Sequence, residues 1–99
     1  MRKIVLLCAA GMSTSVLVKK MKEACVAEGL DYDINAYSVT ELNNVSKDAD
    51  MILLGPQIKF QLDKVKEVAT CPVQAIDMQA YGMMNGKKVI EEVRKVLGD

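Results

Sequence analysis

The stretch KIVLLCAAGMSTSVLVKKM, residues 3–21, joins an apolar run directly to a helical pattern. The run over Lys3–Leu7 is almost continuously apolar, which is typical of a strand in a sheet that is covered on both faces. A helical pattern follows over residues 14–28, where Met21 and Cys25 recur on one side. A strand that leads straight into a helix is the repeating unit of parallel α/β sheets.

The rest of the chain continues the same alternation. Further strands are expected at Tyr32–Tyr37, Met51–Leu54 and Val73–Ile76. Helical segments are expected at Val39–Val45, from Pro56 to just before Cys71, and at Gly86–Leu97. The apolar stripes of the last two helices are Ile58, Leu62, Val65 and Val68, and Val89, Ile90 and Val93 with Val96 or Leu97. We therefore expect one α/β domain over residues 1–99, with a four-stranded parallel sheet of order 2-1-3-4 and helices on both faces.

Composition narrows the classes of function. The chain has 99 residues, 51% of them hydrophobic, with 13 basic and 13 acidic side chains. A net charge of zero argues against a general nucleic-acid binder, which normally carries a basic excess. The longest apolar run, Ile4–Ala10, is far shorter than the roughly 20 residues of a membrane-spanning helix. It is also short for a signal peptide, so a strand explains it better.

The chain contains three cysteines and no histidine. Cys8, Cys25 and Cys71 form no C-x-x-C pair, so we expect neither a disulfide framework nor a zinc site, and no cofactor. This usage favours a reduced, cytosolic protein. Cys25 falls on the apolar side of its helix and Cys71 precedes a proline, and both are expected to be structural. Any step that needs an imidazole has to take it from a partner.

Cys8 stands at the exit of the first strand, where this fold places its ligands. In a sheet of order 2-1-3-4 the strand order reverses between strands one and three, so residues 8–13 and Gly55–Gln57 flank the predicted site. The helix that follows presents unpaired N–H groups and a partial positive charge, which favour bound anions and the ionised thiolate of Cys8. The residues predicted to bind a phosphoryl group are Ala9, Ala10, Gly11, Met12, Ser13, Thr14 and Ser15.

The loop after Cys8 lacks the arginine of a cysteine-dependent phosphatase. The C-x5-R pattern of those enzymes has Thr14 at its last position here, and no arginine occurs between Arg2 and Arg94. A site without that guanidinium could bind a phosphoryl group yet hydrolyse it poorly, which suits a relay. Two alternatives stay open: a small phosphatase or thiol-based oxyanion reductase, and a non-catalytic anion- or nucleotide-binding module. The chain has neither a G-x-G-x-x-G nor a G-x-x-x-x-G-K-[ST] motif.

Three segments, LLCAAGMSTSVLV, LLGPQI and IDMQAYGMMNG, together resemble the enzyme II B component of the bacterial sugar phosphotransferase system, in its lactose, cellobiose and chitobiose class. The resemblance covers essentially the whole chain. It implies a fold similar to low-molecular-weight tyrosine phosphatases. It also implies a transferase, a protein-phosphohistidine–sugar phosphotransferase, in which Cys8 becomes a phosphocysteine.

The resemblance further implies two protein partners. The phosphoryl group would come from a phosphohistidine on the A component and go to a sugar bound by the membrane-embedded C component. The chain would then be cytoplasmic and peripherally associated with that transporter. The sequence leaves the oligomeric state open, and a monomer is the default expectation. Residues expected at the rim of the site or in contact with a partner are Gly55, Pro56, Gln57, Asp77 and Tyr81. Gln57 could donate to the phosphoryl group or cap its helix, and no role is assigned to Asp77 or Tyr81.

Overall fold

Within residues 1–8 and 14–99, the part of the chain that the computed structural model describes, four strands form one parallel sheet. The strands are β1 (Arg2–Cys8), β2 (Tyr32–Ser38), β3 (Met51–Leu54) and β4 (Val73–Ala75). Their order is β2-β1-β3-β4, so β1 and β3 are central. The predicted fold class and strand order are confirmed.

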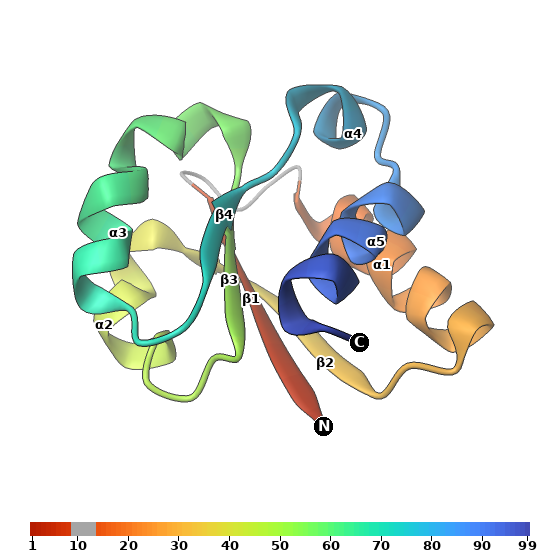
Figure 1. Cartoon of the computed structure of the whole chain (residues 1–99). Helices are drawn as coiled ribbons and strands as arrows, with labels where there is room; N and C mark the ends of the chain where they lie inside the picture. The colour runs from red at the N-terminus through yellow and green to blue at the C-terminus, as the bar shows by residue number, and fades with distance from the viewer. Residues whose placement is uncertain (9–13) are drawn as a thin grey trace.

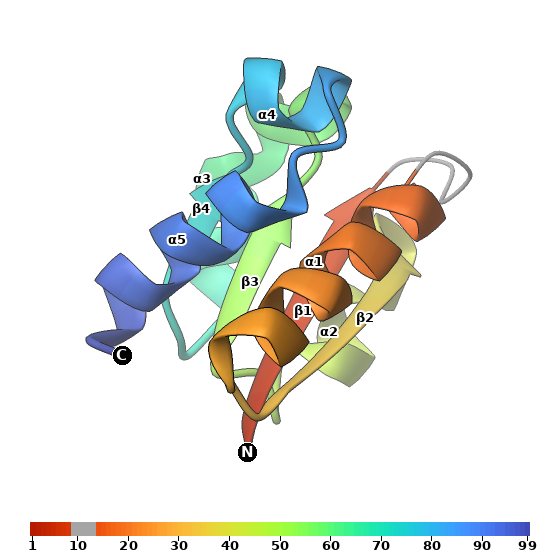
Figure 2. The same ribbon diagram turned by 90° about the vertical axis from the view of Figure 1, so that its right-hand side faces the viewer.

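Helices cover both faces of the sheet (Figure 1). Two of them, α1 (Thr14–Glu28) and α5 (Gly86–Leu97), lie side by side on one face (Figure 2). On the other face lie α2 (Leu42–Val45) and α3 (Leu62–Val68), preceded by the short 3-10 helices η1 (Val39–Glu41) and η2 (Pro56–Gln61). A further helix, α4 (Met78–Gly82), sits beyond the carboxyl end of β4. Among the residues described, no helix is long and apolar enough to cross a membrane.

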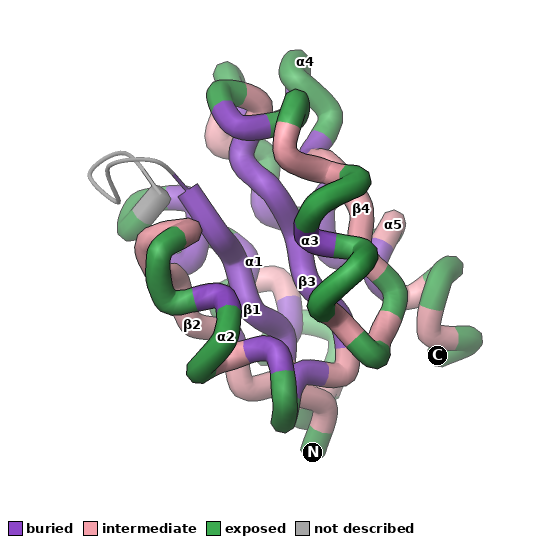
Figure 3. The backbone as a smooth tube through the Cα atoms, turned by 90° about the vertical axis from the view of Figure 1, so that its left-hand side faces the viewer, coloured by how far each residue is buried: buried purple, intermediate pink, exposed green. Residues whose placement is uncertain are grey.

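The sheet separates two hydrophobic clusters, because successive side chains of a strand point to opposite faces. Ile4 and Leu6 pack with α1 and α5, whereas Val5 and Leu7 pack with side chains from α2, η2 and α3. All four are almost completely buried (Figure 3). A central strand covered on both sides explains why the opening run is continuously apolar.

The two helices of one face approach each other closely at Gly86, the first residue of α5. A Cβ atom placed on Gly86 would lie 2.4 Å from the carbonyl carbon of Lys20 and 2.5 Å from the amide nitrogen of Met21. Both atoms belong to the backbone of α1, so no side-chain rotation could relieve the contact. Glycine at this position therefore sets how near α5 packs to α1.

A cluster of polar groups at the amino end of the sheet is centred on Asp99. Arg2 donates to its carboxylate from Nε (3.0 Å, to Oδ2) and from Nη2 (2.9 Å, to Oδ1). The hydroxyl of Tyr32 also donates to Oδ2 of Asp99, at 2.8 Å. Arg94 donates to the backbone oxygen of Asp99 and, from Nη1, to Oε1 of Glu28. This Asp99 cluster ties β1, β2 and α1 to the last turn of α5.

Four details of the predicted elements were wrong or incomplete. The helix after Pro56 opens as the 3-10 helix η2 and becomes α-helical only at Leu62. Val68, placed in its buried stripe, is 40% exposed, since α3 ends there and the chain turns extended at Ala69. The helix α4 was not predicted. In α5, Leu97 packs against the core while Val96 is exposed.

Candidate active site

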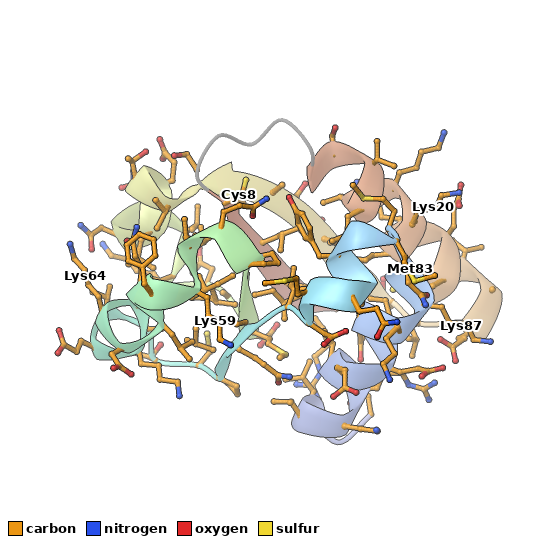
Figure 4. All side chains as sticks on the ribbon, turned by 90° about the horizontal axis from the view of Figure 1, so that it is seen from above. Cys8, Lys20, Lys59, Lys64, Met83 and Lys87 are labelled. Atoms are coloured by element: carbon orange, nitrogen blue, oxygen red, sulfur yellow. The ribbon has the colours of Figure 1, made fainter. Side chains whose placement is uncertain are left out.

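Cys8 is the last residue of β1 and lies at the carboxyl edge of the sheet (Figure 4). Its side chain is buried, with 3% of the residue exposed. The thiol Sγ donates to the backbone oxygen of Tyr37 on β2, at 3.7 Å. The position predicted from the apolar run is therefore the one that Cys8 occupies.

Gly55 lies beside Cys8 at the end of the neighbouring strand. The register pairs Leu7 with Leu54, and the amide of Gly55 donates to the carbonyl oxygen of Leu7 at 2.9 Å. A Cβ atom on Gly55 would lie 3.7 Å from Cβ of Cys8 and 3.0 Å from Oε1 of Gln57. The absence of a side chain at Gly55 thus leaves room for the side-chain amide of Gln57 beside it.

Tyr81 reaches the same place from a third segment. It lies on α4, only 8% exposed, and its hydroxyl oxygen accepts a hydrogen bond from Nε2 of Gln57 at 3.4 Å. Gln57 does not cap its own helix, because no side-chain hydrogen bond caps η2 among the described residues. Its side-chain amide donates to Tyr81 instead. The structure therefore brings together Cys8, Gly55, Gln57 and Tyr81 from the ends of β1, β3 and β4. Pro56, the first residue of η2, starts the turn that makes this possible.

Asp77 has a structural contact instead. Its Oδ2 accepts a hydrogen bond from the amide of Ala80 at 3.0 Å, which makes Asp77 the N-cap of α4. Its carboxyl group also borders a hollow beside the edge strand β4, together with Gln74, Lys88 and Glu92. Asp77 thus acts on the site through α4, the helix that carries Tyr81.

Two of the seven predicted phosphate-binding residues, Thr14 and Ser15, belong to the described part of the chain. Residues 9–13, which hold Ala9, Ala10, Gly11, Met12 and Ser13, lie outside the described residues. The helix α1 begins at Thr14, and Ser15 is exposed in its first turn. A helix of this length beginning just after Cys8 agrees with the predicted geometry, and the phosphate contacts themselves stay a prediction.

The other two cysteines belong to the hydrophobic clusters. Cys25 is buried on α1, and burial, with a smaller contribution from the charge of Glu28, raises the pKa of its thiol. Cys71 packs partly buried against the opposite cluster, and burial followed by the charge of Asp50 raises its thiol pKa too. Because the thiolate is the nucleophilic form, both environments disfavour attack by these sulfurs. No group of three His, Cys, Asp or Glu side chains is placed to hold a metal ion in the described part of the chain.

Exposed apolar side chains lie on segments that follow three of the strands at the carboxyl edge. We call Val16, Phe60, Met78 and Met83 the apolar collar. They lie on α1, on η2 and at the two ends of α4, the segments that follow β1, β3 and β4. Phe60 is 81% exposed and Met83 69%. Seen from above, Lys64 lies to the left of Cys8, whereas Lys20 and Lys87 lie to the right, near Met83 (Figure 4).

Comparison with protein families gives a match over most of the chain. The family described as "PTS system, Lactose/Cellobiose specific IIB subunit" matches residues 3–92. A galactose-specific EIIB component from Lactococcus lactis subsp. cremoris is 43% identical over 102 aligned residues, which cover 95% of this chain and 94% of that protein. A cellobiose-specific EIIB component from L. lactis subsp. lactis has the same identity and coverage. An oligo-beta-mannoside-specific EIIB component from Bacillus subtilis is 40% identical and covers 98% and 97%.

Solved structures show the same arrangement of elements. The lactose-specific IIB domain of Streptococcus pneumoniae superposes with a TM-score of 0.84 over 96% of each chain, at 18% identity. The solution structure of a cellobiose-specific IIB protein from Borrelia burgdorferi gives a TM-score of 0.80 at 32% identity, covering 98% of this chain and 92% of that one. The first similarity shows the fold alone, whereas the second also shows sequence kinship.

Proposed function

Because this chain belongs to the lactose/cellobiose-specific IIB family of the sugar phosphotransferase system, we propose that Cys8 is the residue that carries the phosphoryl group. The IIB components of that system are phosphotransferases with a relay role, and they work with A and C components. The specific donor we propose is a phosphohistidine on the A component. The acceptor is a sugar bound by the membrane-embedded C component, which would place this chain at the cytoplasmic face of the membrane.

The observation that carries the proposal is the position of Cys8 relative to the other thiols. Cys8 ends a central strand at the edge where Gly55, Gln57 and Tyr81 meet, and the long helix α1 begins shortly after it. Cys25 and Cys71 pack in the two clusters below that edge. Ligands bind at this edge in parallel α/β sheets, so its place in the fold, rather than its exposure, makes Cys8 the thiol that we assign to the transfer.

The first transfer exchanges a nitrogen–phosphorus bond for a sulfur–phosphorus bond. The Cys8 thiolate attacks phosphorus in line with the bond to the imidazole nitrogen of the donor. The S–P bond forms as the P–N bond breaks, and the released nitrogen keeps the electron pair and takes up a proton. This chain has no histidine, so the imidazole in this step belongs to the partner.

The second transfer returns the sulfur to its starting state. A hydroxyl oxygen of the bound sugar attacks phosphorus, the O–P bond forms, and sulfur leaves as thiolate. The hydroxyl proton passes to a base on the C component. The partial positive charge at the N-terminus of α1 would favour the anionic phosphoryl group. The amides of residues 9–14 and the hydroxyls of Ser13, Thr14 and Ser15 are the proposed phosphate ligands.

The apolar collar supports a role in which protein partners dock around Cys8. Phe60 and Met83 are exposed apolar side chains on two of the segments that follow the strands at this edge, where a docking partner could cover them. The lysines beside them favour a partner that carries an anionic phosphoryl group. Because the A and C components must each reach the same sulfur, they would use this face in turn.

Transfer of label from a phosphorylated A component tests the proposal. The wild-type chain, Cys8→Ser, Cys25→Ser and Cys71→Ser are each mixed with the donor, and bound phosphoryl group is measured after acid-free separation. We expect labelling of the wild type and of the last two variants and none of Cys8→Ser. Labelling of Cys8→Ser at the wild-type rate would show that another residue carries the group. Hydrolysis of a generic aryl phosphate by the wild type would instead favour a phosphatase.

A further inference from the structure

Tyr81 and Gln57 form a pair of side chains at the site that the relay chemistry above does not use. Gln57 Nε2 donates to the hydroxyl oxygen of Tyr81 at 3.4 Å, across 24 positions of the sequence. The phenol is nearly buried, at 8% exposure, whereas Gln57 is exposed at the rim. A buried hydroxyl held by an amide at the edge of an active site has to be explained by more than packing.

The direction of this hydrogen bond decides what the phenol can do. Its oxygen accepts from Gln57, so this bond does not use the O–H of the phenol as a donor. The Gln57 side chain lies over Gly55, and a Cβ atom placed on Gly55 would lie 3.7 Å from Cβ of Cys8. Gln57 therefore links the phenol of Tyr81 to the turn at Gly55, which lies directly beside Cys8.

We propose that Tyr81 donates a hydrogen bond to the phosphoryl group on Cys8, and that Gln57 is the positioning residue that orients the phenol. This inference rests on the proposed phosphorylation of Cys8. A phosphoryl group carries oxygens that accept several hydrogen bonds, and a phenolic O–H to an ionised acceptor is one of the stronger kinds. Asp77 contributes indirectly, since its cap on Ala80 fixes the short helix that carries Tyr81.

Removing the hydroxyl alone tests the role of Tyr81. Tyr81→Phe keeps the ring that packs in the core, and we expect it to accept phosphoryl from the A component about tenfold to a hundredfold more slowly, the range set by one hydrogen bond to a charged group. The phosphorus NMR resonance of the phosphocysteine should also shift. The matched control is Tyr32→Phe, because the Tyr32 hydroxyl donates to Asp99 at the opposite end of the sheet. That variant should retain the wild-type rate and resonance.

Gln57→Ala tests the positioning role without changing a buried residue. We expect a smaller loss of rate than in Tyr81→Phe, and no further loss when the two changes are combined, since Gln57 acts through the phenol. A merely structural effect would instead lower the denaturant midpoint and leave the phosphorus resonance in place. A Tyr81→Phe variant with the wild-type rate and resonance would overturn this inference and leave the proposed function standing. A wild-type chain that never shows the resonance would overturn the proposed function as well.

Discussion

Substitution of Gly86 by alanine should strongly destabilise the fold, because α5 has no room for a methyl group where it crosses α1. The added Cβ would lie 2.4 Å from the carbonyl carbon of Lys20 and 2.7 Å from its oxygen. Ordinary contacts of this kind begin near 3.4 Å, so the helices must separate by roughly 1 Å. That shift loosens the packing of Met21 against Ile90 and Val93 in the shared cluster.

The expected cost is at the upper end of what overpacking causes. Overpacking a core lowers the free energy of unfolding by about 1–3 kcal/mol. Because the added methyl group meets backbone rather than a movable side chain, we expect a loss of about 3 kcal/mol. For a domain of this size that lowers the melting temperature by on the order of 10 to 20 °C. Equilibrium unfolding in urea, followed by circular dichroism, gives the change in midpoint, and the slope should stay constant.

Gly82→Ala is the matched control for this measurement. Gly82 is also helical, and a Cβ placed on it would meet nothing within 4 Å. Alanine there should be neutral or stabilise by up to about 1 kcal/mol, because it restricts the unfolded chain. Equal midpoints for Gly86→Ala and Gly82→Ala would refute the claim that backbone contact between α1 and α5 requires glycine.

The remaining predictions concern the rim, the collar and the Asp99 cluster. Gly55→Ala should change the unfolding free energy by no more than about 0.5 kcal/mol. The backbone of Gly55 is extended, and the 3.0 Å contact of the added Cβ is with the movable end of the Gln57 side chain. The variant should nevertheless accept the phosphoryl group more slowly, and an unchanged rate would contradict a role for the Gly55–Gln57 contact. Phe60→Ser and Met83→Ser should slow transfer from the A component without loss of stability. Val26 is as exposed as Phe60 but lies away from the collar, so Val26→Ser should leave the transfer rate unchanged. Equal effects of all three substitutions on the rate would refute a docking role. Burial, more than its bond to Asp99, raises the pKa of Tyr32 from 10.0 to about 12, so its contribution to stability is complete below pH 10 and is lost as pH rises toward 12. Tyr32→Phe should lack that alkaline loss, and a parallel decline in both proteins would contradict it. The bond from Arg2 lowers the pKa of Asp99, so the stability it contributes fades as pH falls through that lowered value, and Asp99→Asn should remove this acid dependence.

The sheet could be predicted because its central strands are covered on both faces. Runs such as those ending at Cys8 and Leu54 have no polar alternation, and in parallel sheets this indicates a central position. The location of Cys8 followed from the apolar run that ends there and from the strand order, since the order reverses beside β1. These inferences depend on the spacing of the apolar residues and on the order of the strands, and both can be inferred from a single sequence.

The features that were missed depend on contacts between distant segments or on elements too short to show a period. The helix α4 spans Met78–Gly82, which is little more than one turn, so the only local signal was Asp77 placed before Ala80 as a cap. Nothing in the spacing of Gln57 and Tyr81 predicts their hydrogen bond, because it arises only when the ends of β3 and β4 meet. Likewise, Gly86 was expected to begin a helix, but its contact with Lys20 is a property of how two helices pack.

The most direct test of the central claim is to locate the phosphoryl group in the chain after reaction with a phosphorylated A component. Fragmentation of the labelled protein by mass spectrometry, under conditions that preserve S–P bonds, assigns the added mass to a residue. The account predicts the group on Cys8 and on neither Cys25 nor Cys71. A phosphoryl group found on any other residue, with Cys8 unmodified, would contradict it.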